Sequence, residues 1–208
     1  VAGGRVFNSS PFALIADTKS FPRSEWPASW AELASKAKHK VLVQDPRLSA
    51  AGVGWLRVIF SYQLMSVEAS RTSVLATFPS GSAAYQALVS QKAPIIWTFL
   101  GSEAYHLCHG DGERYRVIPL QEGYPLYEER VAWLSPVNGG LAARFVDFVM
   151  SEATQKRIPE LNWMFPARAG VTLPTCFAGV TKVKTLAAST AVDAKELQRW
   201  MDLWGDQP

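Results

Sequence analysis

The repeated order of a short apolar run, a polar turn and a helix-like segment is the feature that most constrains this fold. Four such runs, at residues 11–16, 41–44, 73–78 and 93–98, are the right length and composition for buried strands. Strands that alternate with helices are typical of an α/β fold with a largely parallel sheet. Two more strands are expected at 116–120 and 126–134, and helices at 29–36, 50–65, 83–90 and 102–108.

The pattern changes to helix from about residue 138. Apolar residues recur at helical spacing from 141 to 158, and Pro159 is expected to end that helix. The stretch 162–183 is predicted to be mainly loop, and 194–204 is predicted to form an amphipathic helix. Because this tail contains so few strand signals, we expect it to complete a layer of a larger fold rather than to form its own domain.

Composition and charge exclude several classes of protein. Hydrophobic residues make up 48% of the chain and charged residues 19%, which predicts a packed core rather than disorder. A net charge of +3 gives little electrostatic support for nucleic-acid binding, and no apolar run approaches the length of a membrane span. The two cysteines are too few for a disulfide framework and leave the redox compartment open. The chain starts at Val1 without a segment that resembles a signal peptide, so we expect a mature or partial chain.

No arrangement of residues predicts an enzyme or a metal site. The segment 81–83 (GSA) lacks the second glycine of a nucleophile elbow. Residues 106–111 contain two histidines, a cysteine and an aspartate, but no partner ligand pair lies elsewhere, so we interpret them as an exposed helix end. Residues 110–113 lack the alternating ligands of a calcium loop and predict a turn. We expect no catalytic residue, no cofactor and no metal.

Two features favour a ligand site. Ser49 stands where a strand gives way to a helix, and such a position suits either an anion or polar ligand or simply a helix cap. Aromatic residues gather near strand and loop ends, where they serve either as core or as a stacking cleft. These aromatic residues are Trp97, Phe99, Tyr105, Tyr124, Tyr127 and Trp163.

Several short sequence motifs, in their order along the chain, resemble those of the periplasmic thiamine-binding proteins of ABC transporters. The resemblance covers nearly the whole chain. The motifs are QDPR with Ser49 and Gly52 at 44–52, SAAY at 82–85, AYH at 104–106, EGY at 122–124, NWMFP at 162–166 and VTLP at 171–174.

The resemblance implies a type II periplasmic-binding-protein-like α/β fold, in which two lobes are joined by crossover strands and close over a ligand. Residues 1–16 would be a crossover segment and residues 17–120 one complete α/β lobe, lobe two. Residues 121–208 would contain the return crossover and the C-terminal helices of a partial, helical lobe one. The first part of lobe one would then be absent from this chain.

The resemblance also implies a set of ligand-binding residues. Tyr105 and Trp163 correspond to stacking rings, and Trp97 or Phe99 to a further ring, while Ser49 lies at the polar end. Glu103 would add a carboxylate near the cleft, and Tyr124 belongs to the EGY motif that resembles the family. Gly81 stands where the family has a tryptophan. We therefore expect Tyr105, Trp163 and the Ser49 turn to converge on one cleft.

The implied function is solute binding for an ABC importer. The chain would bind thiamine or a related small cationic or phosphorylated solute in the periplasm and deliver it to a membrane permease. The alternative is a truncated domain that has lost transport function and self-associates through its exposed terminal helices.

Overall fold

The computed structural model describes residues 4–36, 38–133, 139–187 and 191–205. A mixed sheet forms its centre, with the strand order β3-β2-β4-β1-β5. β2 runs parallel to β3 and β4, whereas β1 is antiparallel to β4 and β5. These strands are β1 (Arg5–Asp17), β2 (Val41–Gln44), β3 (Val74–Phe78), β4 (Ile95–Phe99) and β5 (Tyr115–Val117).

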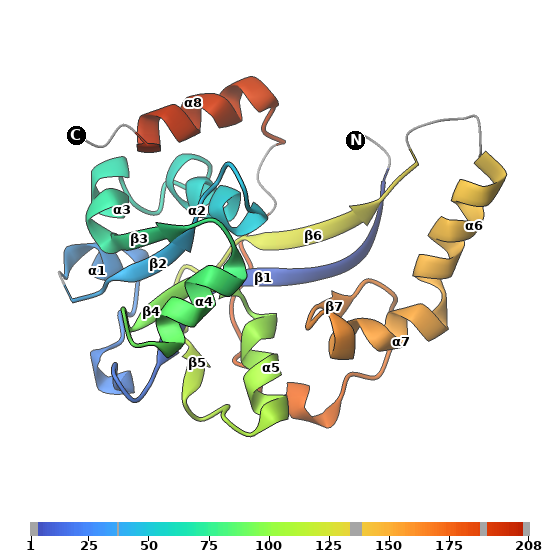
Figure 1. Cartoon of the computed structure of the whole chain (residues 1–208), viewed down its shortest axis with the longest axis horizontal. Helices are drawn as coiled ribbons and strands as arrows, with labels where there is room; N and C mark the ends of the chain where they lie inside the picture. Colours follow the sequence, from blue (N-terminus) through green and yellow to red (C-terminus); the bar gives the residue numbers. More distant parts are fainter. Residues whose placement is uncertain (1–3, 37, 134–138, 188–190, 206–208) are drawn as a thin grey trace.

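The long strand β1 takes part in two regions of the sheet. Its second half pairs with β4 and β5, and its first half pairs with β6 (Leu126–Val131) and β7 (Phe165–Pro166). Figure 1 shows β1 and β6 side by side as they extend from the α/β part toward α6 and α7. The sequence predicted only 11–16 as strand, because residues 5–10 are too polar to indicate one without the partner that β6 supplies. The predicted end of β6 at Leu134 lies outside the described residues.

The helices follow most of the predicted positions. The α-helices are α1 (Trp30–Ser35), α2 (Ala50–Phe60), α3 (Val67–Ser73), α4 (Gly81–Val89), α5 (Gly101–His109), α6 (Gly139–Met150), α7 (Glu152–Leu161) and α8 (Ala194–Gly205). Short 3-10 turns lie at η1 (Arg23–Glu25) and η3 (Thr175–Gly179). No helix in the described ranges combines the length and apolarity needed to cross a membrane.

Two helix predictions need correction. The helix predicted over 50–65 ends at Phe60, and the separate helix α3 follows it, capped by the Ser66 side chain. Pro159 does not end α7, which continues to Leu161. Proline lacks the N–H of one helical hydrogen bond and crowds the preceding turn, but the hydrogen bonds after it can still form, and Asn162 N donates to Ile158 O at 2.9 Å.

Four large aromatic side chains, each at most 1% exposed, form the centre of the core. Trp97 lies edge-on to Trp30 and Trp55, with ring centroids 5.8 and 5.5 Å away. Its Nε1 donates to Ala51 O at 2.7 Å, and the Tyr124 hydroxyl donates to Ile118 O at 2.5 Å. The core therefore accounts for every polar atom of these two rings.

The C-terminal helix α8 packs on the α/β part, against α2 and α3 (Figure 1). Trp200 stacks on Phe60 with centroids 5.3 Å apart, and Trp204 Nε1 donates to Ser70 Oγ at 3.1 Å. This placement differs from the resemblance, which implied that the terminal helices would all belong with lobe one. Trp200 and Trp204, on the predicted apolar face of α8, are buried against α2 and α3, and this burial determines where α8 packs.

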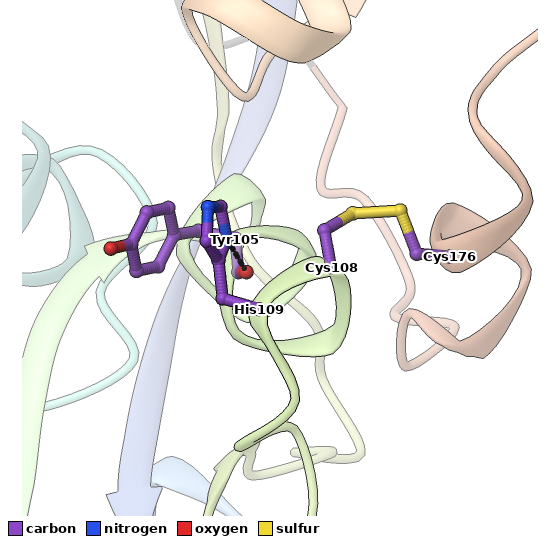
Figure 2. The surroundings of a disulfide bond; sticks show 4 residues. All are labelled: Tyr105, Cys108, His109 and Cys176. Carbon is purple, nitrogen blue, oxygen red and sulfur yellow. Dashed lines mark hydrogen bonds between the residues drawn. A yellow bond between two sulfur atoms is a disulfide. The ribbon is translucent and has the colours of Figure 1, made fainter.

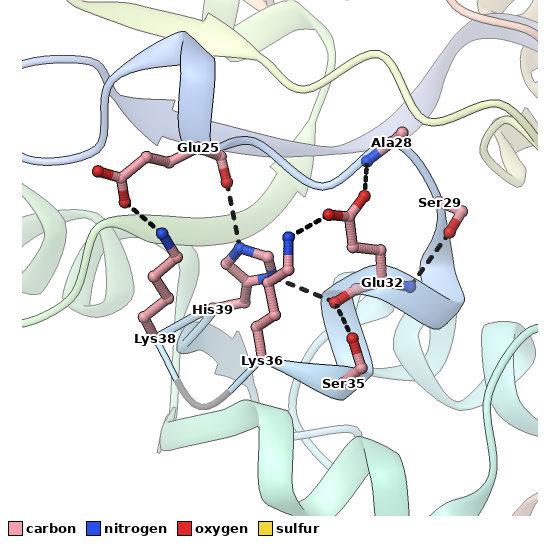
Figure 3. A network of polar contacts seen from close by, with 8 residues as sticks. All are labelled: Glu25, Ala28, Ser29, Glu32, Ser35, Lys36, Lys38 and His39. Carbon is pink, nitrogen blue, oxygen red and sulfur yellow. Dashed lines mark hydrogen bonds and ion pairs between the residues drawn. The ribbon is translucent and has the colours of Figure 1, made fainter.

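The entry to α1 shows how local capping fixes the predicted helix start (Figure 3). Ser29 Oγ accepts from Glu32 N at 3.1 Å, and Glu32 Oε2 accepts from Ala28 N at 2.8 Å. The buried His39 ring closes the network, with its two nitrogens 3.2 Å from Glu32 O and Glu25 O. Lys36 and Lys38 are thus held in ion pairs with Glu32 and Glu25 near this helix, whereas Lys40 donates to Thr72 O.

Candidate functional site

A cavity of about 570 Å³ lies at the carboxyl ends of the parallel strands β2 and β4. Ligands of open α/β sheets bind at such positions. The amino ends of α4 and α5 form one side, and the segment after α7 forms another. The lining residues are Gln44, Gly81, Ser82, Tyr85, Gln86, Thr98, Phe99, Gly101, Ser102, Tyr105, Asn162, Trp163 and Met164.

Tyr105 and Trp163 form an aromatic wall of the cavity. Their ring centroids lie 5.2 Å apart and their planes are nearly perpendicular. His109 stacks on Tyr105 at 4.2 Å and lies 5.3 Å from Trp163. Tyr105 is 40% exposed, so its ring remains open to a ligand. Phe99 contributes a further ring at the end of β4.

The backbone of Trp163 is held in an unusual position. Its φ of 55° lies in the left-handed region, which a bulky residue rarely adopts. Its carbonyl packs directly on Gly101, where an added Cβ would lie only 1.6 Å from Trp163 O. Glycine at the start of α5 is therefore required for the approach of the tryptophan segment, although sequence reasoning did not single out Gly101.

Ser49 supports the cavity from behind. Its Oγ accepts from Ala51 N at 3.1 Å, as an N-cap of α2, and lies 2.5 Å from Gln44 Oε1. Gln44 in turn lines the cavity. Ser49 thus acts as the helix cap that the sequence left open, and it orients a lining side chain rather than lining the cavity itself.

Three of the expected ligand residues lie in the interior instead. Trp97 and Tyr124 belong to the aromatic core, and burial raises the pKa of the Tyr124 hydroxyl. Glu103 is fully buried, and its carboxylate accepts from Val117 N at 3.0 Å and from Thr181 N at 2.6 Å. Arg116 Nε lies 3.1 Å from the same carboxylate. These three side chains are buried, and their polar groups have partners in the protein. Of the expected ligand-binding residues, Phe99, Tyr105 and Trp163 therefore line the cavity, and Ser49 lies behind them.

The expectation of an exposed helix end at residues 106–111 is also wrong for His106, which is 2% exposed. His106 Nδ1 lies 2.6 Å from Asp111 Oδ1, while its Nε2 and the nearby Tyr85 hydroxyl have no partner within the described residues. Burial lowers the pKa of His106, and the hydrogen bond to Asp111 opposes that shift in part. Cys108 pairs with Cys176 in a disulfide (Figure 2). The described residues hold no cluster of three or more potential metal ligands among His, Cys, Asp and Glu.

Comparison with known proteins identifies the family. A family model described as bacterial extracellular solute-binding protein matches residues 1–160. The chain belongs to this family. Its members bind solutes, and the curated relatives of this solute-binding protein are named as binding proteins rather than enzymes.

The relatives include the thiamine-binding periplasmic proteins of Brucella abortus and Escherichia coli. The first is 30% identical over 93% of this chain and 60% of its own length, and the second is 29% identical over 95% and 62%. The present solute-binding protein thus spans about 60% of the length of the curated relatives that it matches.

Solved structures agree on the fold. A periplasmic thiamin binding protein superposes with a TM-score of 0.81 at 28% identity, over 98% of this chain and 67% of that chain. The periplasmic binding protein AfuA from Actinobacillus pleuropneumoniae superposes at 0.70 with 15% identity, over 98% and 67%. The solute-binding protein therefore has the type II periplasmic-binding-protein fold that the resemblance implied, with part of the two-lobe structure.

Proposed function

We propose that this chain binds thiamine or a closely related heteroaromatic cation in the cavity, against the aromatic wall formed by Tyr105 and Trp163. The observation that carries the proposal is the pair of rings 5.2 Å apart in a cavity large enough for a small solute. The names of the curated relatives support thiamine among such solutes.

The chemistry of the cavity wall suits a flat cation. The lining residues contribute rings and neutral polar groups but no carboxylate, so attraction for a cation rests on the ring faces. A cation over an aromatic face gains about 0.5–2 kcal/mol per contact. Ser82, Ser102 and Asn162 supply hydrogen-bonding groups for a hydroxyl or phosphoryl end of the solute. Residues at the amino ends of α4 and α5 line the cavity, and helix amino ends attract negative charge, which favours a phosphorylated form of the solute.

Titration calorimetry with thiamine, thiamine monophosphate and choline tests this proposal. We expect binding of at least one thiamine form and about 2- to 30-fold weaker binding for Trp163→Ala and Tyr105→Ala. Leu203→Ala is the control, because Leu203 is an exposed apolar residue of α8 that lies outside the cavity. Absence of binding for all three ligands refutes the proposal, as does an equal loss for the control.

We further propose that the chain serves an ABC importer from the periplasm and delivers its solute to the membrane permease. The periplasmic location of the curated relatives supports this placement, and so does the disulfide, since disulfides persist in oxidising compartments. Thiamine uptake into proteoliposomes that contain a thiamine permease, with and without the chain, measures delivery. Uptake that is independent of the chain contradicts this part of the proposal.

A second candidate function is self-association through α6. Leu141, Phe145 and Phe148 lie on one helix face and are 73%, 58% and 63% exposed. Leu141 and Phe145, together with Trp133, border an almost wholly apolar hollow. Contiguous apolar faces of this kind mark interaction sites, and one helix face can pair with its own copy around a two-fold axis.

Light scattering decides whether two copies pair through α6. We expect a dimer that Phe145→Glu converts to a monomer. Leu203→Glu, which adds the same charge at an exposed leucine on α8, leaves the dimer intact. A monomeric parent chain at micromolar concentration contradicts the candidate.

A further inference from the structure

The disulfide joins the wall of the cleft to a distant segment. Cys108 lies in the last turn of α5 and Cys176 in η3, 68 positions apart in sequence, with Cα atoms 5.2 Å apart. Figure 2 shows the Tyr105 and His109 rings on one side of α5 and the disulfide on the other. The helix that carries the Tyr105 ring is therefore covalently tied to η3.

The residue after Cys176 supports the second ring of the wall. Phe177 is 6% exposed, and its ring lies parallel to Trp163 with centroids 6.5 Å apart. It also contacts Phe165 edge-on at 5.8 Å. Because Trp163 has a left-handed backbone, it needs packing partners to keep that conformation. Phe177 is such a partner, and η3 holds it in place.

Within the described residues, the polar contacts that tie η3 and the residues just after it to β5 and α5 lie on its carboxyl side. Thr181 N donates to the buried carboxylate of Glu103 at 2.6 Å, and Arg116 donates to Gly179 O at 3.3 Å. Both contacts lie after Phe177 in the chain. The disulfide is the covalent tie on the other side, directly before Phe177.

We infer that the Cys108–Cys176 disulfide is a positioning element for the ligand cleft, which holds Phe177 against Trp163 and thereby fixes the distance between the Tyr105 and Trp163 rings. The consequence for affinity rests on the proposed function, whereas the consequence for the order of the Trp163 segment does not.

The test compares the double variant Cys108→Ser/Cys176→Ser with Phe177→Ala, which keeps the disulfide and removes only the supporting ring. Hydrogen exchange of residues 163–179 measures order without any ligand. We expect at least 10-fold faster exchange there in both variants, with β2 and β4 unchanged. Calorimetry is expected to show about 3- to 30-fold weaker thiamine binding for both, and Leu203→Ala is the control.

Unchanged exchange at 163–179 in either variant overturns the inference. Exchange that rises equally in β2 and β4 of the folded double variant also overturns it, because the disulfide then acts only on global stability. If the double variant does not fold, Phe177→Ala alone decides. If the parent chain binds no thiamine, the proposed function fails while the exchange result still decides the positioning role. Faster local exchange with unchanged affinity refutes the link to the cleft.

Discussion

Replacement of Gly101 by alanine tests how the cleft is built. The new Cβ would lie 1.6 Å from Trp163 O, whereas an ordinary contact is about 3.5 Å, so the tryptophan segment must move by roughly 1.5–2 Å. Because the obstacle is backbone and not the end of a flexible side chain, the cost belongs near the upper end of the range for overpacking, about 3 kcal/mol of unfolding free energy. The movement also separates Trp163 from Tyr105.

Urea unfolding followed by circular dichroism measures the stability of Gly101→Ala, and calorimetry measures its thiamine affinity. We expect a loss of about 2–4 kcal/mol and at least 10-fold weaker binding, equivalent to about 1.4 kcal/mol. Gly140→Ala is the matched control, since a Cβ there meets nothing within 4 Å and alanine favours the helix slightly. If Gly101→Ala is as stable as the parent and binds equally well, the close approach does not constrain the cleft.

Two further predictions concern other parts of the site. Gly81→Trp introduces the ring that the thiamine-binding family has at this cavity-lining position, where a Cβ fits at 3.4 Å from the Gln44 side chain. Thiamine affinity measured by calorimetry should therefore rise about 3- to 10-fold. Unchanged or weaker binding contradicts this placement of the ring. Since burial lowers the pKa of His106, the unfolded chain takes up the proton first as pH falls, and stability should decline below about pH 6.5 by up to about 1.4 kcal/mol per pH unit. Urea unfolding from pH 7 to pH 5 should show a smaller decline in His106→Gln, and an identical decline refutes the assignment.

Local signals in the sequence predicted most of the regular structure. The strands at 41–44 and 73–78 and the cap at Ser29 depend on periodicity and on short-range hydrogen bonds, both of which the sequence contains. The polar half of β1 depends on pairing with β6, more than a hundred residues away, and local patterns do not carry that information. The disulfide could not be predicted from the sequence either. Cys108 and Cys176 are 68 positions apart, and only the fold brings them together.

The candidate site was predictable only in part for a related reason. Trp97 and Phe99 stand two positions apart on the same strand and look alike in sequence. Phe99 ends the strand and reaches the cavity, whereas Trp97 lies deeper, where Ala51 O of α2 covers its polar edge. The sequence identifies an aromatic residue near a strand end, but how deep its ring lies depends on the helix packed above it.

The continuity of β1 has a mechanical consequence. The backbone of β1 runs without interruption from the region of the sheet that contains β4 and β5 to the region that contains β6 and β7. β6 is hydrogen-bonded along the first half of β1. Two adjacent hydrogen-bonded strands bend together readily but resist sliding past each other. A change of angle between the two regions must therefore be absorbed as curvature of this ribbon, and the register shift between Val6 and Asn8 is where its pairing is already interrupted.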